Sequence, residues 1–135
     1  MKLVISKKFP RGVRKIIRAA IGASNAYAPM GVSVVFVQPV NGIEYAGSAS
    51  EYQGMALIHL CHTDEDFLDT LFHECFHIHQ YAKGILEQKE NGFVYRGIYI
   101  PLWLYTPLHS FIPFELSAKA FARKMCQRLE AVTLP

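Results

Sequence analysis

Hydrophobic and polar positions follow a helical period at the start of this chain and a strand-like pattern after it. From Arg11 to Tyr27, apolar residues recur at helical spacing and basic residues fall on the opposite side, which predicts an amphipathic helix. Residues 32–38, 43–46 and 55–61 are apolar runs of strand length, separated by Gly, Asn and Pro. We therefore expect three strands joined by short turns, forming a small and mostly antiparallel sheet.

The second half of the chain predicts two further helices around a hairpin. Thr63 stands three residues before Asp66, a variant of the capping box, and Gly84 follows the helical pattern, so we expect a helix over residues 64–83. Strand-like runs on both sides of an Arg-Gly pair predict a hairpin over residues 93–100. After two prolines, a last helix is expected from about Phe114 to Glu130.

These elements define an α+β fold. The 135 residues correspond to one domain, 1–135, and 51% hydrophobic with 19% charged residues excludes disorder. The expected order is an N-terminal helix, a small three-stranded sheet, a motif-bearing helix, a hairpin insertion and a C-terminal helix. No apolar run approaches the roughly 20 residues that cross a bilayer, so no membrane partner is expected.

The cysteines and the N-terminus favour a cytoplasmic location. The three cysteines are an odd number without CxxC spacing, which argues against a disulfide framework and a cysteine-ligated zinc knuckle. Basic residues interrupt any apolar core of an export signal near the N-terminus.

Charge is distributed unevenly along the sequence. The net charge is +3, yet residues 1–18 carry seven Lys or Arg and no acid. Arg11, Arg14, Lys15 and Arg18 form the basic side of the first helix, which could contact nucleic acid or an acidic protein surface. A solvated helix face explains the same residues and is the favoured interpretation.

The strongest chemical signal is the HExxH motif of His73, Glu74 and His77 inside the second predicted helix. Residues four positions apart lie above one another on a helix, so two imidazoles can reach one metal ion. The Glu between them would face a water molecule on that metal. This geometry is typical of zinc hydrolases.

The helical wheel separates the motif from its neighbours. The motif falls on a polar side that also holds Gln80 and Tyr81, opposite an apolar side that holds Cys75. We interpret Cys75 as a buried thiol. His79 lies roughly 160° from His77 on a helix, so we interpret it as a packing residue and not as a ligand.

A catalytic zinc ion usually has three protein ligands, so a third must come from elsewhere. The candidates are His59, His62, His109 and the acids. Glu115 is favoured because it lies at the margin of the apolar stripe of the last helix, where a carboxylate needs a positive partner. The alternative is that Glu115 bonds to its own helix N-terminus. His109 is the reserve ligand.

The strings FHECFHIHQY and PFELSAKAFA resemble the minimal zincin metallopeptidases. These include the ImmA/IrrE-like domains and similar short HExxH proteins of phages and prophages. The resemblance implies that His73, His77 and Glu115 bind Zn²⁺, as in gluzincin-type enzymes, and that Glu74 is the catalytic base. Phe76 stands where the ImmA/IrrE motif usually has Gly, and the interval from His77 to Glu115 is longer than in that group. The Gln80-Tyr81 pair and the hairpin before Glu115 are more similar to the phage-type proteins.

The leading hypothesis is a zinc metallopeptidase that hydrolyses peptide bonds with Glu74 as general base. Tyr105 and His109 are the first candidates for a catalytic donor to the oxyanion, and Tyr95 and Tyr99 are alternatives. The run 54–60 is expected to be the sheet edge at which an extended substrate adds as a strand.

Two other hypotheses remain. One is a zinc-stabilised binding module without turnover, which uses the basic N-terminal helix for nucleic acid or a protein partner. The other is an ordinary α+β domain in which HExxH arises by chance.

Overall fold

The computed structural model describes residues 1–42 and 46–133, with side chains described through residue 129. The elements in chain order are β1 (Lys2–Ile5), α1 (Arg11–Tyr27), β2 (Val34–Pro39), β3 (Gly47–Tyr52), β4 (Met55–Leu60), α2 (Phe67–Ala82), β5 (Leu86–Lys89), β6 (Gly92–Tyr95), β7 (Ile98–Pro101), α3 (Leu102–Leu108), the 3₁₀ turn η1 (His109–Phe111) and α4 (Pro113–Thr133). The chain therefore has an α+β fold, as the sequence predicts.

The main sheet is four-stranded and mixed, with the order β1-β2-β4-β3. The pairs β1–β2 and β2–β4 are parallel, and only β3 runs antiparallel to β4. The expectation of a three-stranded, mostly antiparallel sheet is therefore wrong. The run 54–60 is also not the edge, because β4 lies between β2 and β3, and the edge on this side is β3. The strand expected over residues 43–46 falls almost entirely on residues 43–45, outside the described part of the chain.

The second sheet is a small antiparallel unit of the order β5-β6-β7. Its β6–β7 pair joins Tyr95 to Ile98 around Arg96 and Gly97, both of which have positive φ. The predicted hairpin is confirmed, and β5 extends it by one strand.

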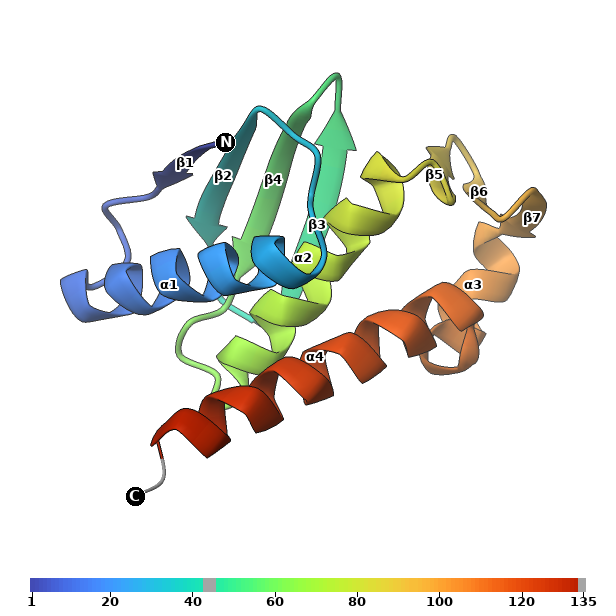
Figure 1. The fold of residues 1–135 in the computed structure, drawn as a ribbon. Coiled ribbons are helices and arrows are strands. Elements are labelled where there is room, and N and C mark those ends of the chain that lie inside the picture. The colour runs from blue at the N-terminus through green and yellow to red at the C-terminus, as the bar shows by residue number, and fades with distance from the viewer. Residues whose placement is uncertain (43–45, 134–135) are drawn as a thin grey trace.

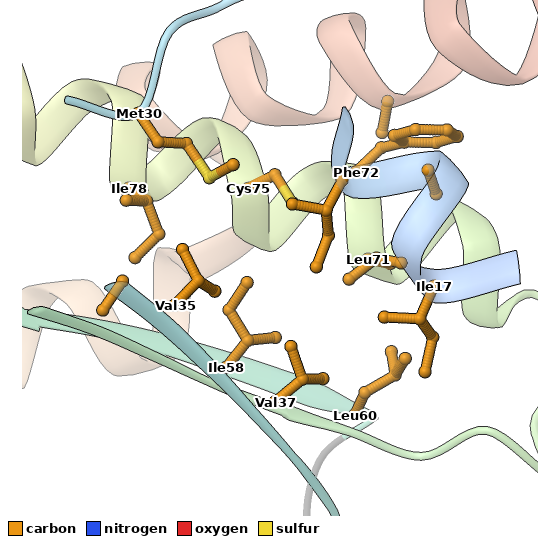
Figure 2. Close-up of a cluster of buried hydrophobic side chains, with 14 of the residues drawn as sticks. Ile17, Met30, Val35, Val37, Ile58, Leu60, Leu71, Phe72, Cys75 and Ile78 are labelled. Carbon is orange, nitrogen blue, oxygen red and sulfur yellow. The ribbon is translucent and has the colours of Figure 1, made fainter. Parts of the chain in front are cut away.

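The helices are arranged on one side of the main sheet (Figure 1). In the view of Figure 1, α1 lies across the lower part of the strands, α2 rises diagonally along their right side, and α4 crosses α2 on the side away from the sheet. Figure 2 shows Val35, Val37, Ile58 and Leu60 pointing from the sheet toward the buried side chains of α1 and α2, including Ile17. This core fixes the apolar side of α2 and leaves its polar side facing α4.

Helix boundaries follow the predictions with local differences. The first helix is confirmed as α1, and α2 ends just before Gly84, whose φ of +72° suits a glycine. However, α2 begins at Phe67 instead of residue 64, and Asp66 makes no side-chain capping bond, so the predicted capping box is wrong. The helix α3 is not predicted from the sequence, because two prolines interrupt the segment before the last helix. Pro107 inside α3 lacks an N–H donor and crowds the carbonyl of Trp103, and the helix extends only one residue beyond it.

Small buried residues bring α4 close to α2. Ala118 and Ala122 are fully buried at 0% exposure, and Phe76 of α2 stacks on Phe121 of α4 with ring centroids 4.8 Å apart. Side chains without a γ carbon allow two helices to approach closely. This packing places Glu115, in the first turn of α4, against the motif of α2.

Within the described ranges, no helix combines the length and apolar character needed to cross a membrane.

Candidate metal centre

The polar side of α2 and the first turn of α4 meet in a buried triad of His73, His77 and Glu115. Glu115 Oε1 lies 2.8 Å from the Nε2 atoms of both histidines, and these two nitrogens are 3.1 Å apart. The Glu115 side chain is only 3% exposed, and those of His73 and His77 are 14% and 9% exposed. The three residues form a group that could hold a metal ion. The carboxylate of Glu115 thus faces the histidines and does not cap its own helix.

The hydrogen bonds of Gln80 determine which ring nitrogen of a neutral His77 carries the proton. Gln80 Nε2 donates a hydrogen bond to the carbonyl of Phe114 (3.0 Å), which fixes the orientation of the amide. Gln80 Oε1 must then face His77 Nδ1, at 2.8 Å, and accept its proton. A neutral His77 therefore has a bare lone pair on Nε2, directed at the triad.

This arrangement fits a cation. The bare Nε2 of His77 and the carboxylate Oε1 of Glu115 both carry lone pairs, so their 2.8 Å contact is repulsive unless positive charge neutralises it. A proton on His77 or a metal ion among the three atoms provides that charge. Ligand atoms around tetrahedral zinc stand about 3.3 Å apart, since each lies about 2.0–2.2 Å from the metal. The triad needs only a few tenths of an ångström of expansion to match.

The pKa shifts in the triad also favour a negative carboxylate beside positive charge. Burial raises the pKa of the Glu115 carboxyl, but hydrogen bonds from His73 and His77 outweigh burial and hold this pKa well below its usual range. Burial lowers the pKa of His77, but the hydrogen bond and charge of Glu115 outweigh it and bring the net value above the usual one. The carboxylate is therefore ionised in the folded protein.

The second oxygen of Glu115 is also bound. Tyr105 Oη donates a hydrogen bond to Glu115 Oε2 (2.7 Å), and His109 Nε2 lies 3.1 Å from the same oxygen. Burial and the nearby Glu115 charge raise the pKa of the Tyr105 hydroxyl well above its usual range. Tyr105 thus keeps its proton and acts as a donor, and the structure brings both residues expected near the oxyanion to the site.

Glu74 lies beside the triad and is 8% exposed. Burial raises the pKa of its carboxyl, while His77 and His73 partly oppose this shift. The neighbouring strand β3 approaches closely here: a Cβ on Gly47 would lie 2.5 Å from Thr70 Cγ2 and 3.4 Å from Glu74 Cγ. A glycine at position 47 is therefore needed for the edge strand to pass over this part of α2.

A cavity of about 220 Å³ opens onto these groups. One wall is the edge strand β3, with small residues at positions 47–49, and Glu74, His77 and Glu115 lie along it. The opposite side comes from the segment between α2 and α4, and is largely aromatic. Its contributors are Gln88, Phe93, Tyr105 and His109 of this segment, together with Tyr81 of α2 and Phe114 of α4.

Other candidates from the sequence lie away from the triad. His59 Nδ1 faces Ser48 Oγ at 3.4 Å, and the His62 ring packs on Phe9 with centroids 5.2 Å apart. His79 Nδ1 donates to the carbonyl of Pro29 (2.7 Å), in agreement with its predicted packing role.

Cys75 and two of the tyrosines also lie outside the group. Cys75 is fully buried in the core, as expected, and burial raises the pKa of its thiol to about 12. Tyr99 Oη donates to the carbonyl of Asn91 (3.1 Å), and Tyr95 receives a bond from Arg96 Nε (3.3 Å). Neither tyrosine lines the cavity.

Sequence reasoning missed two features of this site. Gln80 was placed on the polar side of α2 without a role, although its position three residues after His77 puts both on one helix face. The polar edge strand β3 was not expected, because its sequence GSASEY lacks the β-branched and aromatic residues typical of strands.

Comparisons with known proteins do not assign this chain to a family. No protein-family model, curated protein or solved structure matches this chain. The resemblance to minimal zincins stays a prediction, and its supported part is a group of His73, His77 and Glu115 that could hold a metal ion.

Proposed function

We propose that this chain is a zinc-dependent peptidase of the gluzincin type. The observation that carries the proposal is the convergence of His73, His77 and Glu115 at one point, beside the buried acid Glu74 and a cavity. Two histidines and one carboxylate are a frequent ligand set of catalytic zinc and leave one position for water or substrate.

A zinc ion held by these ligands would supply Lewis-acid polarisation of a carbonyl and a lowered pKa for water. Glu74 is the general base in this proposal, because it lies between the two ligand histidines in sequence and lines the cavity without joining the triad. Burial raises the pKa of its carboxyl, which is the direction that favours proton transfer, first from water and then to the leaving amine.

We assign the oxyanion donor to Tyr105, with His109 as the second candidate. Both contact Glu115 Oε2 and line the cavity. Tyr105 stays protonated over the physiological range because its pKa is raised. A hydrogen-bond donor placed where negative charge develops is worth about 10²–10³-fold in rate.

The substrate in this proposal is an extended peptide. Strand β3 is an edge of the main sheet and forms one wall of the cavity, so its free backbone groups can pair with a peptide as a further strand. The small residues at 47–49 leave room for that backbone, and the aromatic opposite wall favours apolar side chains on the peptide.

The test compares Glu74→Gln with His77→Ala on a library of internally quenched fluorescent peptides. Glu74→Gln should retain one zinc per chain and lose cleavage, and His77→Ala should lose both zinc and cleavage. Glu65→Gln, the same change at an exposed acid outside the site, serves as the matched control and should behave like the parent. Cleavage by the Glu74→Gln variant at the parental rate would show that the base is assigned wrongly.

A second candidate is a zinc-stabilised binding module. The favouring observation is that Arg11, Lys15 and Arg18 are exposed on α1 near the exposed Lys7 and Lys8, with no acid in residues 1–18. Salt-sensitive binding of duplex DNA, unaffected by Glu74→Gln, would support this function. Absence of DNA binding at low salt would exclude its nucleic-acid version.

A further inference from the structure

Gln80 connects the two helices that build the metal centre. Its side chain is fully buried, at 0% exposure, and both ends of its amide are used. Oε1 accepts from His77 Nδ1 on α2, and Nε2 donates to the carbonyl of Phe114, the residue directly before Glu115. One side chain thus contacts a ligand histidine and the backbone that presents the ligand carboxylate.

We propose that Gln80 is a positioning residue, which holds His77 with its proton on Nδ1 and fastens that ring to the α4 turn bearing Glu115. This inference rests on the proposed metal centre. It adds a residue that touches neither the cation nor the substrate and acts through His77 and Phe114.

The amide suits this role better than the other polar side chains. His77 Nδ1–H requires an acceptor and the Phe114 carbonyl requires a donor, and a glutamine offers one of each at its two ends. A carboxylate would place two lone pairs against the Phe114 carbonyl, and an apolar residue would leave both buried groups without a partner. Partners of this kind behind ligand histidines typically contribute 10–100-fold to metal affinity.

The first experiment measures zinc affinity by competition with a chromophoric chelator. Gln80→Met removes both hydrogen bonds at similar volume, and Gln80→Asn keeps the amide but is one methylene too short to span both partners. Each variant should bind zinc 10–100-fold more weakly than the parent. Gln127→Met, at an exposed position of α4, is the matched control and should retain parental affinity. Parental affinity in either folded Gln80 variant would overturn the proposal.

The second experiment determines the tautomer of His77 directly in the metal-free parent protein. Long-range ¹H–¹⁵N NMR, recorded at a pH high enough for the His77 ring to be neutral, identifies which ring nitrogen of each neutral histidine carries the proton. His77 should carry it on Nδ1 in the parent, and a parent with the proton on Nε2 would refute the inference even if neither variant folds. Failure of the parent to bind zinc would instead refute the proposed metal centre, while the tautomer still tests Gln80.

Discussion

Glu115 Oε1 and His77 Nε2 lie 2.8 Å apart, although 38 positions separate the two residues in the sequence. Each atom is a metal-ligand type with a lone pair facing the other, and both are buried. The packing of α4 on α2 therefore holds together two groups that repel each other without a cation or a proton. The predictions below follow from this contact and from the packing that enforces it.

Removing one imidazole of the triad should abolish zinc binding. We expect the zinc content after dialysis to fall from one zinc per chain in the parent to less than about a tenth of that in His77→Ala, since two ligands hold zinc far more weakly than three. His79→Ala, two positions further on the same helix, contacts Pro29 and should retain full zinc content. The measurement is metal analysis by mass spectrometry. Equal zinc loss in both variants would indicate a general folding defect.

Zinc should raise the thermal stability of the parent protein. Binding to the folded state alone adds about 2.7 kcal/mol to the free energy of unfolding when free zinc is a hundredfold above Kd. We expect a Tm increase of about 10 °C for a domain of this size. Calorimetry with zinc and with a chelator measures it. An unchanged Tm at saturating zinc would contradict a site at the triad.

The metal-free protein should be most stable in mildly acidic solution. The pKa of Glu115 is lowered by folding, so its stabilisation is present above the unfolded value of about 4.3 and is lost as pH falls further. The pKa of His77 is raised, so its stabilisation is present below about 6.5 and is lost as pH rises through the folded value. The pKa of Glu74 is raised, so its protonated form favours the folded state and its contribution lowers stability as pH rises above the unfolded value of about 4.3.

The stabilising contributions of Glu115 and His77 are complete only between about pH 4.3 and 6.5, and Glu74 opposes folding increasingly above about pH 4.3. Urea unfolding without metal should therefore give its maximum in the lower half of this window, at about pH 4.5–5.5. Zinc competes with protons for the histidines, and saturating zinc should therefore move the maximum above pH 7. A pH profile that is the same with and without zinc would exclude these residues as ligands.

Enlarging a small buried residue between α2 and α4 should weaken zinc binding without changing a ligand residue. Ala118 is fully buried, so Ala118→Leu should cost about 1–3 kcal/mol by overpacking and weaken zinc binding by moving Glu115. Ala120→Leu introduces the same side chain at an exposed position of the same helix and should change stability by less than about 0.5 kcal/mol. Chemical denaturation and zinc titration compare the two variants.

Removal of the Tyr105 hydroxyl separates catalysis from metal binding. In the proposed function, Tyr105→Phe should lower kcat about 10²–10³-fold while the variant still binds one zinc per chain. Tyr99→Phe removes a hydroxyl that bonds to Asn91 outside the cavity, and it should leave kcat unchanged. A Tyr105→Phe variant with parental kcat would remove this residue from the mechanism.

The helices α1, α2 and α4 and the triad were predictable because their signals are local. His73 and His77 lie one helical turn apart, and Glu115 stands at the margin of an apolar stripe with Ala118 and Ala122. Such patterns depend on neighbours within a few residues. The contact between the two helices then followed from the need of a buried carboxylate for a positive partner.

Sheet topology was not predictable to the same degree. The strand β1 has four residues, and β3 is rich in Gly, Ser and Ala, so neither has a strong strand signal. The order β1-β2-β4-β3 depends on where α1 and α2 pack, which the local pattern of each strand does not contain. For this reason the edge strand was assigned to β4 instead of β3.

The segment between α2 and α4 leaves and rejoins the core at nearly the same place, because His77 and Glu115 are in contact at its two ends. This segment also supplies most of the aromatic wall of the cavity, including Phe93 and Tyr105. Away from Tyr105 and His109, which contact Glu115 Oε2, its sequence can therefore diverge without moving the ligand atoms. Such a modular layout lets evolution or protein engineering alter what enters the cleft while the ion-binding chemistry stays constant.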